Sequence, residues 1–287
     1  MKKILVTGST GMLGTEITKQ LSNYFDIFKT SKNKINKSNR FINFDLTTDN
    51  YNILKEWVDP YAIIHCAANT NVDDCEKNKK ESKIVNLDSV KKIVKYFPNS
   101  KIIFISSDAI YSGNDSRLEN SKSKAVNYYG QLKQEAEEFL KKEALNYCII
   151  RSTPVGFSGI NGKSTFVSWI VNNIKKNNKI NLYEDCIFTP VSSSFLAKEI
   201  KFLIEENIKD IVNISSIDSI SKYDFGLKLC KKLNLDISTI NKIKMAKHNF
   251  LAPRNTNQII YSSYVKKYNR NLPSINQTIE ELKNSYN

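Results

Sequence analysis

The chain has few of the residues that metal-dependent or histidine-dependent catalysis requires. Its 287 residues include two histidines, His65 and His248, which lie far apart in the sequence. Its five cysteines are scattered without any C-x-x-C pair, and such a set suits neither a disulfide framework nor a zinc site. We therefore expect no metal site and no catalysis by histidine.

Long apolar runs are also missing. No apolar stretch approaches the roughly 18 residues that a membrane-spanning helix needs. Lys2 and Lys3 precede a short apolar run, as in a secretion signal, but the run stops at Thr7 and is too short for one. We expect a cytoplasmic protein that has no membrane partner.

The net charge of +14 raises the question of nucleic-acid binding, because basic proteins bind phosphate backbones. The lysines are spread along the whole chain and are mixed with many asparagines, which indicates a compositional bias and not a basic patch. A small ligand that carries phosphate groups needs only a local cluster of cations. We therefore expect no nucleic-acid partner.

The first half of the chain alternates short β-rich apolar runs with helical patterns, which indicates a parallel sheet covered by helices. This pattern predicts a doubly wound Rossmann fold of the α/β class. The expected strands are residues 3–7, 26–29, 41–44, 62–66, 101–106 and 147–151. The expected helices are residues 12–21, 52–58, 82–96 and 129–142, and residues 32–40 are expected to form a solvated loop.

The pattern changes after Arg151. Helices are expected at residues 165–175, 195–206, 223–233 and 278–284, and strands near Asn181 and at residues 211–214. No repeat or long linker divides the chain. We expect residues 1–153 to form an NAD(P)-binding domain, with a return of the chain to it around residues 187–216. Residues 154–287 are expected to form mainly a smaller α/β lobe that binds the substrate.

A glycine-rich turn follows the first expected strand and opens the first expected helix. Glycines at this position let the backbone approach a pyrophosphate, whose charge is bound by free N–H groups at the helix N-terminus. The spacing is G-x-x-G-x-x-G, and a turn with a purely structural purpose is the alternative. The residues expected to contact a dinucleotide are Gly8, Thr10, Gly11, Met12, Leu13 and Gly14.

The sequence favours NADPH over NADH. No acidic residue stands about 20 residues after the glycines, where one would bind the ribose 2′-hydroxyl of NADH. The second strand ends instead in Lys29-Thr30-Ser31-Lys32, and we expect Ser31 and Lys32 to accept a 2′-phosphate. Asp45 and Leu46, after the third strand, suit a contact with the adenine. A helix-capping role for Asp45 is the alternative.

Tyr129 and Lys133 stand one helical turn apart, and Ser107 follows a buried strand upstream. A phenol, an ammonium group and a hydroxyl are what proton delivery to a keto oxygen requires. The alternative is an exposed neighbour pair that arose by chance in a chain rich in both residue types. Because the glycine-rich turn and Ser107 are both expected at strand ends, we favour a carbonyl-reducing site.

These elements together resemble the extended branch of the short-chain dehydrogenase/reductase family over nearly the whole chain. Within it the chain is similar to dTDP-4-dehydrorhamnose reductase-like proteins. The segments that carry this second similarity are Thr70-Asn71-Val72-Asp73-Asp74-Cys75-Glu76, Val85-Asn86, Thr189-Pro190, Ala252-Pro253-Arg254 and Leu272-Pro273.

The resemblance implies an NADPH-dependent reductase of a nucleotide-linked 4-keto sugar, with or without a 6-deoxy group, in the synthesis of surface polysaccharide. A homodimer is a further option. It implies that Ser107, Tyr129 and Lys133 are catalytic. Tyr129 protonates the keto oxygen, Lys133 favours the phenolate and holds the nicotinamide ribose, and Ser107 hydrogen-bonds the oxygen. Further residues implied at the cofactor are Cys66, Ala67, Ala68 and Ser106, and at the substrate Asn69, Asp108 and Arg254.

The chain departs from the family pattern after the sixth strand. Many relatives carry there an aromatic residue that packs on the sugar, whereas this chain reads Ser152-Thr153-Pro154. We expect Phe157 to take that role.

Two other functions stay open at this point. Sugar dehydratases and epimerases share the fold, but dehydratases of this family have a glutamate after the aspartate, and here Asp108 is followed by Ala109. A catalytically silent NADP-binding subunit is the other option, because a relative serves methionine adenosyltransferase in that way.

Overall fold

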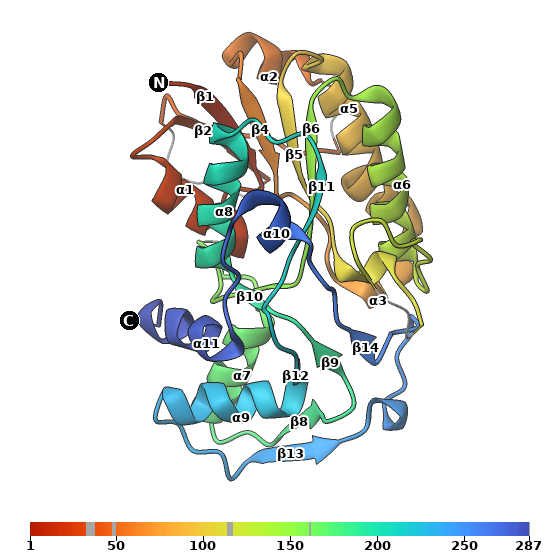
Figure 1. The fold of residues 1–287 in the computed structure, drawn as a ribbon, viewed down its shortest axis with the longest axis vertical. Helices are drawn as coiled ribbons and strands as arrows, with labels where there is room; N and C mark the ends of the chain where they lie inside the picture. The colour runs from red at the N-terminus through yellow and green to blue at the C-terminus, as the bar shows by residue number, and fades with distance from the viewer. Residues whose placement is uncertain (33–37, 48–49, 114–116, 161, 287) are drawn as a thin grey trace.

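The computed structural model describes residues 1–32, 38–47, 50–113, 117–160 and 162–286. Within these ranges a seven-stranded sheet has the order β11-β6-β5-β4-β1-β2-β3, with every ladder parallel (Figure 1). The strands are β1 (Lys3–Thr7), β2 (Asp26–Ser31), β3 (Phe41–Asn43), β4 (Ala62–His65), β5 (Lys101–Ile105), β6 (Tyr147–Ser152) and β11 (Ile211–Ile214). The strand order reverses between β1 and β4, where doubly wound folds bind their ligands. The predicted fold class is confirmed.

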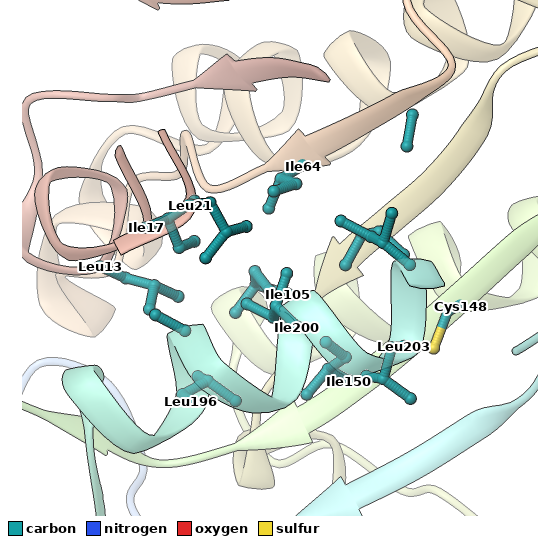
Figure 2. Close-up of a cluster of buried hydrophobic side chains, with 14 of the residues drawn as sticks. Leu13, Ile17, Leu21, Ile64, Ile105, Cys148, Ile150, Leu196, Ile200 and Leu203 are labelled. Carbon is teal, nitrogen blue, oxygen red and sulfur yellow. The ribbon is translucent and has the colours of Figure 1, made fainter. Parts of the chain in front are cut away.

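Helices cover both faces of this sheet, and successive strand residues face opposite cores. Ile4 and Val6 belong to a core with α1 (Met12–Leu21) and α8 (Ser193–Glu205), which Figure 2 shows. Leu5 belongs to the other core, with α2 (Asn52–Trp57), α5 (Ser89–Tyr96) and α6 (Tyr128–Glu143). Burial on both faces is why the inner strands read as continuous apolar runs.

The second lobe lies below the sheet in Figure 1. Its helices are α7 (Phe166–Lys175), α9 (Lys222–Lys232) and α11 (Ile275–Asn284). Its strand pairs are β8 (Ile180–Tyr183) with β13 (Ile240–Ile243), and β7 (Pro154–Val155) with β10 (Val191–Ser192). A three-stranded sheet joins β9 (Ile187–Phe188), β12 (Ile220–Ser221) and β14 (Asn257–Gln258), and α10 (Tyr264–Tyr268) packs back on the large sheet.

The segment between β4 and β5 differs from the single helix expected at residues 82–96. It contains α3 (Val72–Lys77), α4 (Lys79–Lys83), a π-helical turn at Ile84–Asp88 and then α5. The buried Asn86 amide in this turn accepts from the Asn69 N–H and donates to the Asn69 carbonyl, each at 2.9 Å. The widened turn thus directs an amide at the loop after β4, which explains the departure from a regular helix.

Residues 33–37 of the expected loop at 32–40 lie outside the described residues, and the division at residue 153 stays a prediction. Among the described residues no helix is long and apolar enough to cross a membrane. In the same part of the chain no three His, Cys, Asp or Glu side chains gather to hold a metal ion.

Candidate active site

The glycine-rich turn lies at the switch point, between the ends of β1 and β4. Gly8 has a φ of 64°, and a Cβ there would lie 2.7 Å from the backbone N and Cα of Ala67, so a larger residue would force the two segments apart. No side chain caps the first N–H groups of α1, as is also true of α2, α4, α5 and α10, but only α1 begins at the glycine-rich turn. Uncapped N–H groups at a helix N-terminus bind phosphate, so this turn fits the pyrophosphate of a dinucleotide.

A directed chain of hydrogen bonds fixes the ends of β1 and β4 beside this turn. Burial, with a smaller effect of the Lys133 charge, lowers the pKa of His65 to about 3, so the imidazole is neutral. The Ser89 hydroxyl donates to the Val85 carbonyl at 2.6 Å and therefore accepts from His65 Nε2 at 3.2 Å. His65 Nδ1 then accepts from the Thr7 hydroxyl at 2.8 Å, and Thr7 Oγ1 accepts from the Ala67 N–H at 3.4 Å.

The loops after β2 and β3 meet beyond the glycine-rich turn. The hydroxyls of Thr10 and Ser31 are 2.6 Å apart, and Lys32 Nζ lies 3.2 Å from Asp45 Oδ2. Asp45 also accepts from the Thr47 N–H and hydroxyl at 3.0 and 2.9 Å. Burial acts to raise the pKa of Asp45, but the hydrogen bonds from Thr47 and Lys32 outweigh it and the pKa is lowered. The structure thus brings Ser31, Lys32 and Asp45 together, and it also gives Asp45 a local turn-stabilising role.

Several predicted cofactor residues have side chains that are engaged elsewhere. Leu13 and Leu46 are 7% and 8% exposed and belong to the two cores of the sheet. The Ser106 hydroxyl donates to Glu137 at 2.5 Å. Burial raises the pKa of Cys66 to about 12, so the thiol stays protonated. Contacts of these residues with a dinucleotide would therefore use their backbone groups.

Ser107 follows β5 and begins the 3₁₀ turn Asp108–Ile110. Its hydroxyl donates to Asp108 Oδ1 at 2.9 Å and accepts from the Ala109 N–H at 3.1 Å. Burial raises the pKa of Asp108, although the Ser107 hydrogen bond and nearby cations act in the opposite direction. Ser107 and Asp108 thus form one polar unit at the carboxyl edge of the sheet.

Tyr129 and Lys133 lie one turn apart on the buried side of α6, with exposed fractions of 8% and 3%. Lys133 Nζ donates to the carbonyl of Ile105 at 2.8 Å and lies 4.5 Å from the centroid of the Phe104 ring. Because Ile105 stands two residues before Ser107, this bond ties α6 to the strand that leads to Ser107. The structure therefore brings Ser107, Tyr129 and Lys133 to one place.

The protonation states differ from the sequence-based expectation. Burial raises the pKa of Tyr129 above its ordinary value, the Asp108 charge acts in the same direction, and the side chain of Ser107 acts against both. Burial lowers the pKa of Lys133 to about 8. We expected Lys133 to lower the pKa of the phenol, but its ammonium is held by the Ile105 carbonyl and the pKa of Tyr129 is raised. A protonated phenol is the state that a proton donor needs.

The predicted substrate residues Asn69 and Arg254 lie in the loops after β4 and before β14. Asn69 donates through its side chain to Asp74, and this bond is the largest cause of the lowered pKa of Asp74. Arg254 pairs with Asp73 at 2.7 Å, and the carbonyl of Pro253 accepts from the side chain of Asn127, the N-cap of α6, at 2.9 Å. The loop at 252–254 is therefore anchored next to Tyr129.

Phe157 is placed differently from the other predicted substrate residues. Its ring lies 5.4 Å from that of Tyr286, centroid to centroid, and packs against the core of the second lobe. This packing accounts for the aromatic side chain without a sugar. A contact of Phe157 with substrate stays a prediction.

Two cations that face Asp108 were not predicted from the sequence. The charges of Lys222 and Arg117 both act to lower the pKa of Asp108. Lys222 opens α9, and its Nζ lies 5.0 Å from the ring centroids of both Phe166 and Phe188. Arg117 is 2% exposed. Neither cation has a sequence signal, because the chain is rich in lysine and only the fold brings these positions to the Asp108 turn.

Comparison with known proteins gives the family. The chain matches the family described as RmlD substrate binding domain over residues 1–287. It is similar in structure to a dTDP-4-dehydrorhamnose reductase from Bacillus anthracis, solved in complex with NADP, with a TM-score of 0.88 and 22% identity over 98% of each chain. This likeness shows a shared fold.

Two curated relatives cover most of the chain. One is the Probable low-salt glycan biosynthesis reductase Agl14 of Haloferax volcanii, 23% identical over 257 residues, which are 84% of this chain and 83% of the relative. The other is methionine adenosyltransferase 2 subunit beta of Danio rerio, 23% identical over 246 residues, which are 83% of this chain and 76% of the relative. With a family match that spans the whole sequence, the chain belongs to the RmlD substrate binding domain family.

Proposed function

We propose that this protein is an NADPH-dependent reductase of a nucleotide-linked 4-keto-6-deoxy sugar, active in the synthesis of surface polysaccharide. The observation that carries the proposal is the convergence of Ser107, Tyr129 and Lys133 beside a glycine-rich turn that fits a pyrophosphate. The names of two similar proteins, a dTDP-4-dehydrorhamnose reductase and a glycan biosynthesis reductase, support the substrate class.

The residues have separate roles in this reaction. NADPH, when bound, supplies a hydride to the keto carbon. Tyr129 donates its phenolic proton to the keto oxygen, so hydride and proton together convert the ketone to an alcohol. The Ser107 hydroxyl hydrogen-bonds the same oxygen while negative charge develops there. The Lys133 ammonium, which the Ile105 carbonyl holds at 2.8 Å on the next turn of α6, would bind the nicotinamide ribose.

The polar residues at the ends of β2 and β3 support the choice of NADPH. Lys32 supplies a largely exposed ammonium whose present partner is Asp45, and the Ser31 hydroxyl lies beside Thr10 at the glycine-rich turn. A 2′-phosphate would compete with Asp45 for Lys32. In this proposal Ser31 and Lys32 set the preference for NADPH over NADH.

The substrate lies between the Ser107 turn and the second lobe in this proposal. Asp108, Asn69 and Arg254 would bind its polar groups, and Lys222 faces Asp108 from the second lobe. A nucleotide-linked sugar carries a diphosphate, which an ammonium group attracts. Lys222 has this charge, and it lies against two aromatic rings that limit its movement.

A silent regulatory subunit is the second candidate. The similarity to a methionine adenosyltransferase subunit favours it. A chain that served only as a subunit would not need a buried proton donor beside a buried ammonium. Dehydratase activity is disfavoured because Ala109 stands where dehydratases of this kind carry a glutamate base. The proposal also includes a location in the cytoplasm, which cell fractionation tests, and assembly into a homodimer, which light scattering in solution tests.

A screen of nucleotide-activated 4-keto sugars tests the proposed function. The absorbance of NADPH is followed during the reaction, and the products are identified by mass spectrometry and NMR. We expect oxidation of NADPH with at least one dTDP-linked 4-keto-6-deoxy sugar and the matching alcohol as product. No turnover with any such sugar, together with a tight complex with a methionine adenosyltransferase catalytic subunit, would favour the second candidate.

A further inference from the structure

A buried ion pair lies directly behind the proposed catalytic residues. Glu137 on α6 and Arg151 on β6 are 2% and 3% exposed. Arg151 donates to the Glu137 carboxylate through Nε at 3.0 Å and through its terminal nitrogen at 2.6 Å. This is a two-point contact between a helix and a strand, and it fixes their relative position more tightly than a single bond would.

Each member of the pair also holds one side of the Ser107 segment. The Ser106 hydroxyl donates to Glu137 at 2.5 Å. Arg151 donates to the Tyr111 hydroxyl at 2.5 Å, and that hydroxyl donates onward to the Leu118 carbonyl at 2.9 Å. Ser107 lies between Ser106 and Tyr111 in the chain. The ion pair therefore anchors the backbone on both sides of Ser107.

The same pair bears on the other two proposed residues through α6. Glu137 stands one turn after Lys133 and two turns after Tyr129 on the buried side of this helix. The carboxylate charge of Glu137 acts to raise the pKa of Lys133 against the effect of burial. One pair of side chains is thus in contact with every segment that carries the proposed proton-transfer residues.

Stability alone does not account for this pair. Two charges that leave water lose hydration energy, and replacing a buried ion pair by apolar side chains of similar size is often neutral or stabilising. What such a pair supplies instead is a fixed geometry. A site that transfers a proton needs its donor and hydrogen-bonding groups held within a fraction of an ångström.

We propose that Glu137 and Arg151 are positioning residues, whose buried ion pair holds the Ser107 segment in register with Tyr129 and Lys133 on α6. The inference rests on the proposed function, because it assigns these residues to the same reduction. It goes beyond that function in naming two side chains that touch neither the keto group nor the dinucleotide.

Two variants and one matched control test the proposal in the full-length protein. Glu137→Gln keeps the shape of the side chain and removes its charge. The double variant Glu137→Leu, Arg151→Met removes both charges together and leaves no unpaired ion. The control is Glu199→Gln on α8, which removes another buried carboxylate that binds an arginine, Arg270 at 2.7 Å, and a tyrosine hydroxyl, Tyr264 at 2.8 Å.

We expect the double variant to keep its melting temperature within a few degrees of the wild type and to bind NADPH with a similar Kd. Its kcat for keto-sugar reduction is expected to fall by at least about tenfold, because Ser107 and Tyr129 lose their common anchor. The control is expected to keep kcat. A folded double variant with the kcat and pH profile of the wild type would overturn the proposal, as would an equal loss of kcat in the control.

The dependence of kcat on pH in Glu137→Gln is a second measurement. If Glu137 only stabilised the fold, this dependence would not change. The charged and titratable groups facing Lys133 are His65 and Cys66 at the end of β4, Cys75 on α3, and Glu137 itself. His65 is neutral, and the thiols have raised pKa values. Without the Glu137 charge the pKa of Lys133 falls further, so the alkaline limb of kcat moves to lower pH.

Measurement of the Lys133 pKa by NMR separates failure of this proposal from failure of the proposed function. The side-chain signals of Lys133 titrate whether or not any sugar is reduced. A downward shift in Glu137→Gln, absent in Glu199→Gln, supports the placement of the Glu137 charge beside Lys133, on which the proposal depends, even in a protein that shows no turnover. An unchanged Lys133 titration in Glu137→Gln contradicts it.

Discussion

Gly130, next to Tyr129, allows the start of α6 to touch the turn after Ser107. A Cβ at this position would lie 2.2 Å from the carbonyl oxygen of Ala109 and 2.9 Å from the Cβ of Ala125. An ordinary contact is 3.4 Å or more, so in Gly130→Ala the helix and the turn must separate by roughly 1 Å. Tyr129 moves with the helix and Ser107 moves with the turn.

The magnitude of the effect follows from this displacement. Misplacement of a reacting group by 1 Å costs on the order of a hundredfold in rate, and we expect kcat of Gly130→Ala to fall by about that factor. Overpacking costs about 1–3 kcal/mol of stability, and the better helix propensity of alanine offsets up to about 1 kcal/mol of this. The variant is therefore expected to fold and to lose activity.

The assay compares this variant with Gly226→Ala on α9. A Cβ at Gly226 meets the Cδ1 atom of Leu182 at 2.3 Å, which is the end of a flexible side chain that can rotate away. Steady-state oxidation of NADPH and thermal unfolding are measured for both variants. We expect the control to keep kcat within about twofold, since nothing at the Ser107 turn changes. A folded Gly130→Ala protein with wild-type kcat would refute the reasoning.

Three further variants test other parts of the site. Lys32→Ala is expected to raise KM for NADPH about tenfold and to leave KM for NADH unchanged, because the variant loses one cation that would face the 2′-phosphate. Equal changes of KM for both cofactors would contradict this role of Lys32. Turnover of the wild type is expected to fall as the pH rises through about 8, where Lys133 loses its proton. The Lys133→Arg variant keeps its positive charge at this pH, so we expect its turnover not to fall there. A fall that persists in Lys133→Arg would show that another group titrates. Lys222→Met is expected to raise KM for the nucleotide sugar about tenfold without a change in Kd for NADPH, and an unchanged KM would remove Lys222 from the substrate site.

The Rossmann sheet was predictable because its strands and helices carry strong periodic patterns. Burial on both faces forces apolar runs such as Ile63 and Ile64 of β4, and the glycine turn marks the start of α1. Helix α3 was not predicted because Cys75 is the one buried residue among its six, so the helix has no apolar periodicity. Strand β13 was missed because Asn241 and Lys242, at its centre, are exposed and give no apolar alternation.

The candidate site was predictable only where its residues lie on one element or at strand ends. Tyr129 and Lys133 share a helix, and Ser107 follows a strand at the edge of the sheet where the glycine-rich turn also lies, so the sequence could predict their proximity. Lys222 approaches Asp108 through the packing of the second lobe, which no local pattern encodes. The raised pKa of Tyr129 depends on burial and on the nearby Asp108 charge, and both require the folded structure.

Tyr129→Phe tests the central claim most directly, because it removes one oxygen atom from the buried face of α6. Two quantities are measured: the rate of NADPH oxidation with a dTDP-linked 4-keto-6-deoxy sugar, and the Kd for NADPH in the absence of sugar. We expect a fall in kcat of about 10²–10⁴-fold, the usual contribution of a proton donor, with Kd within about twofold of the wild type. Unchanged kcat, or loss of NADPH binding, would contradict the assignment of Tyr129 as the proton donor.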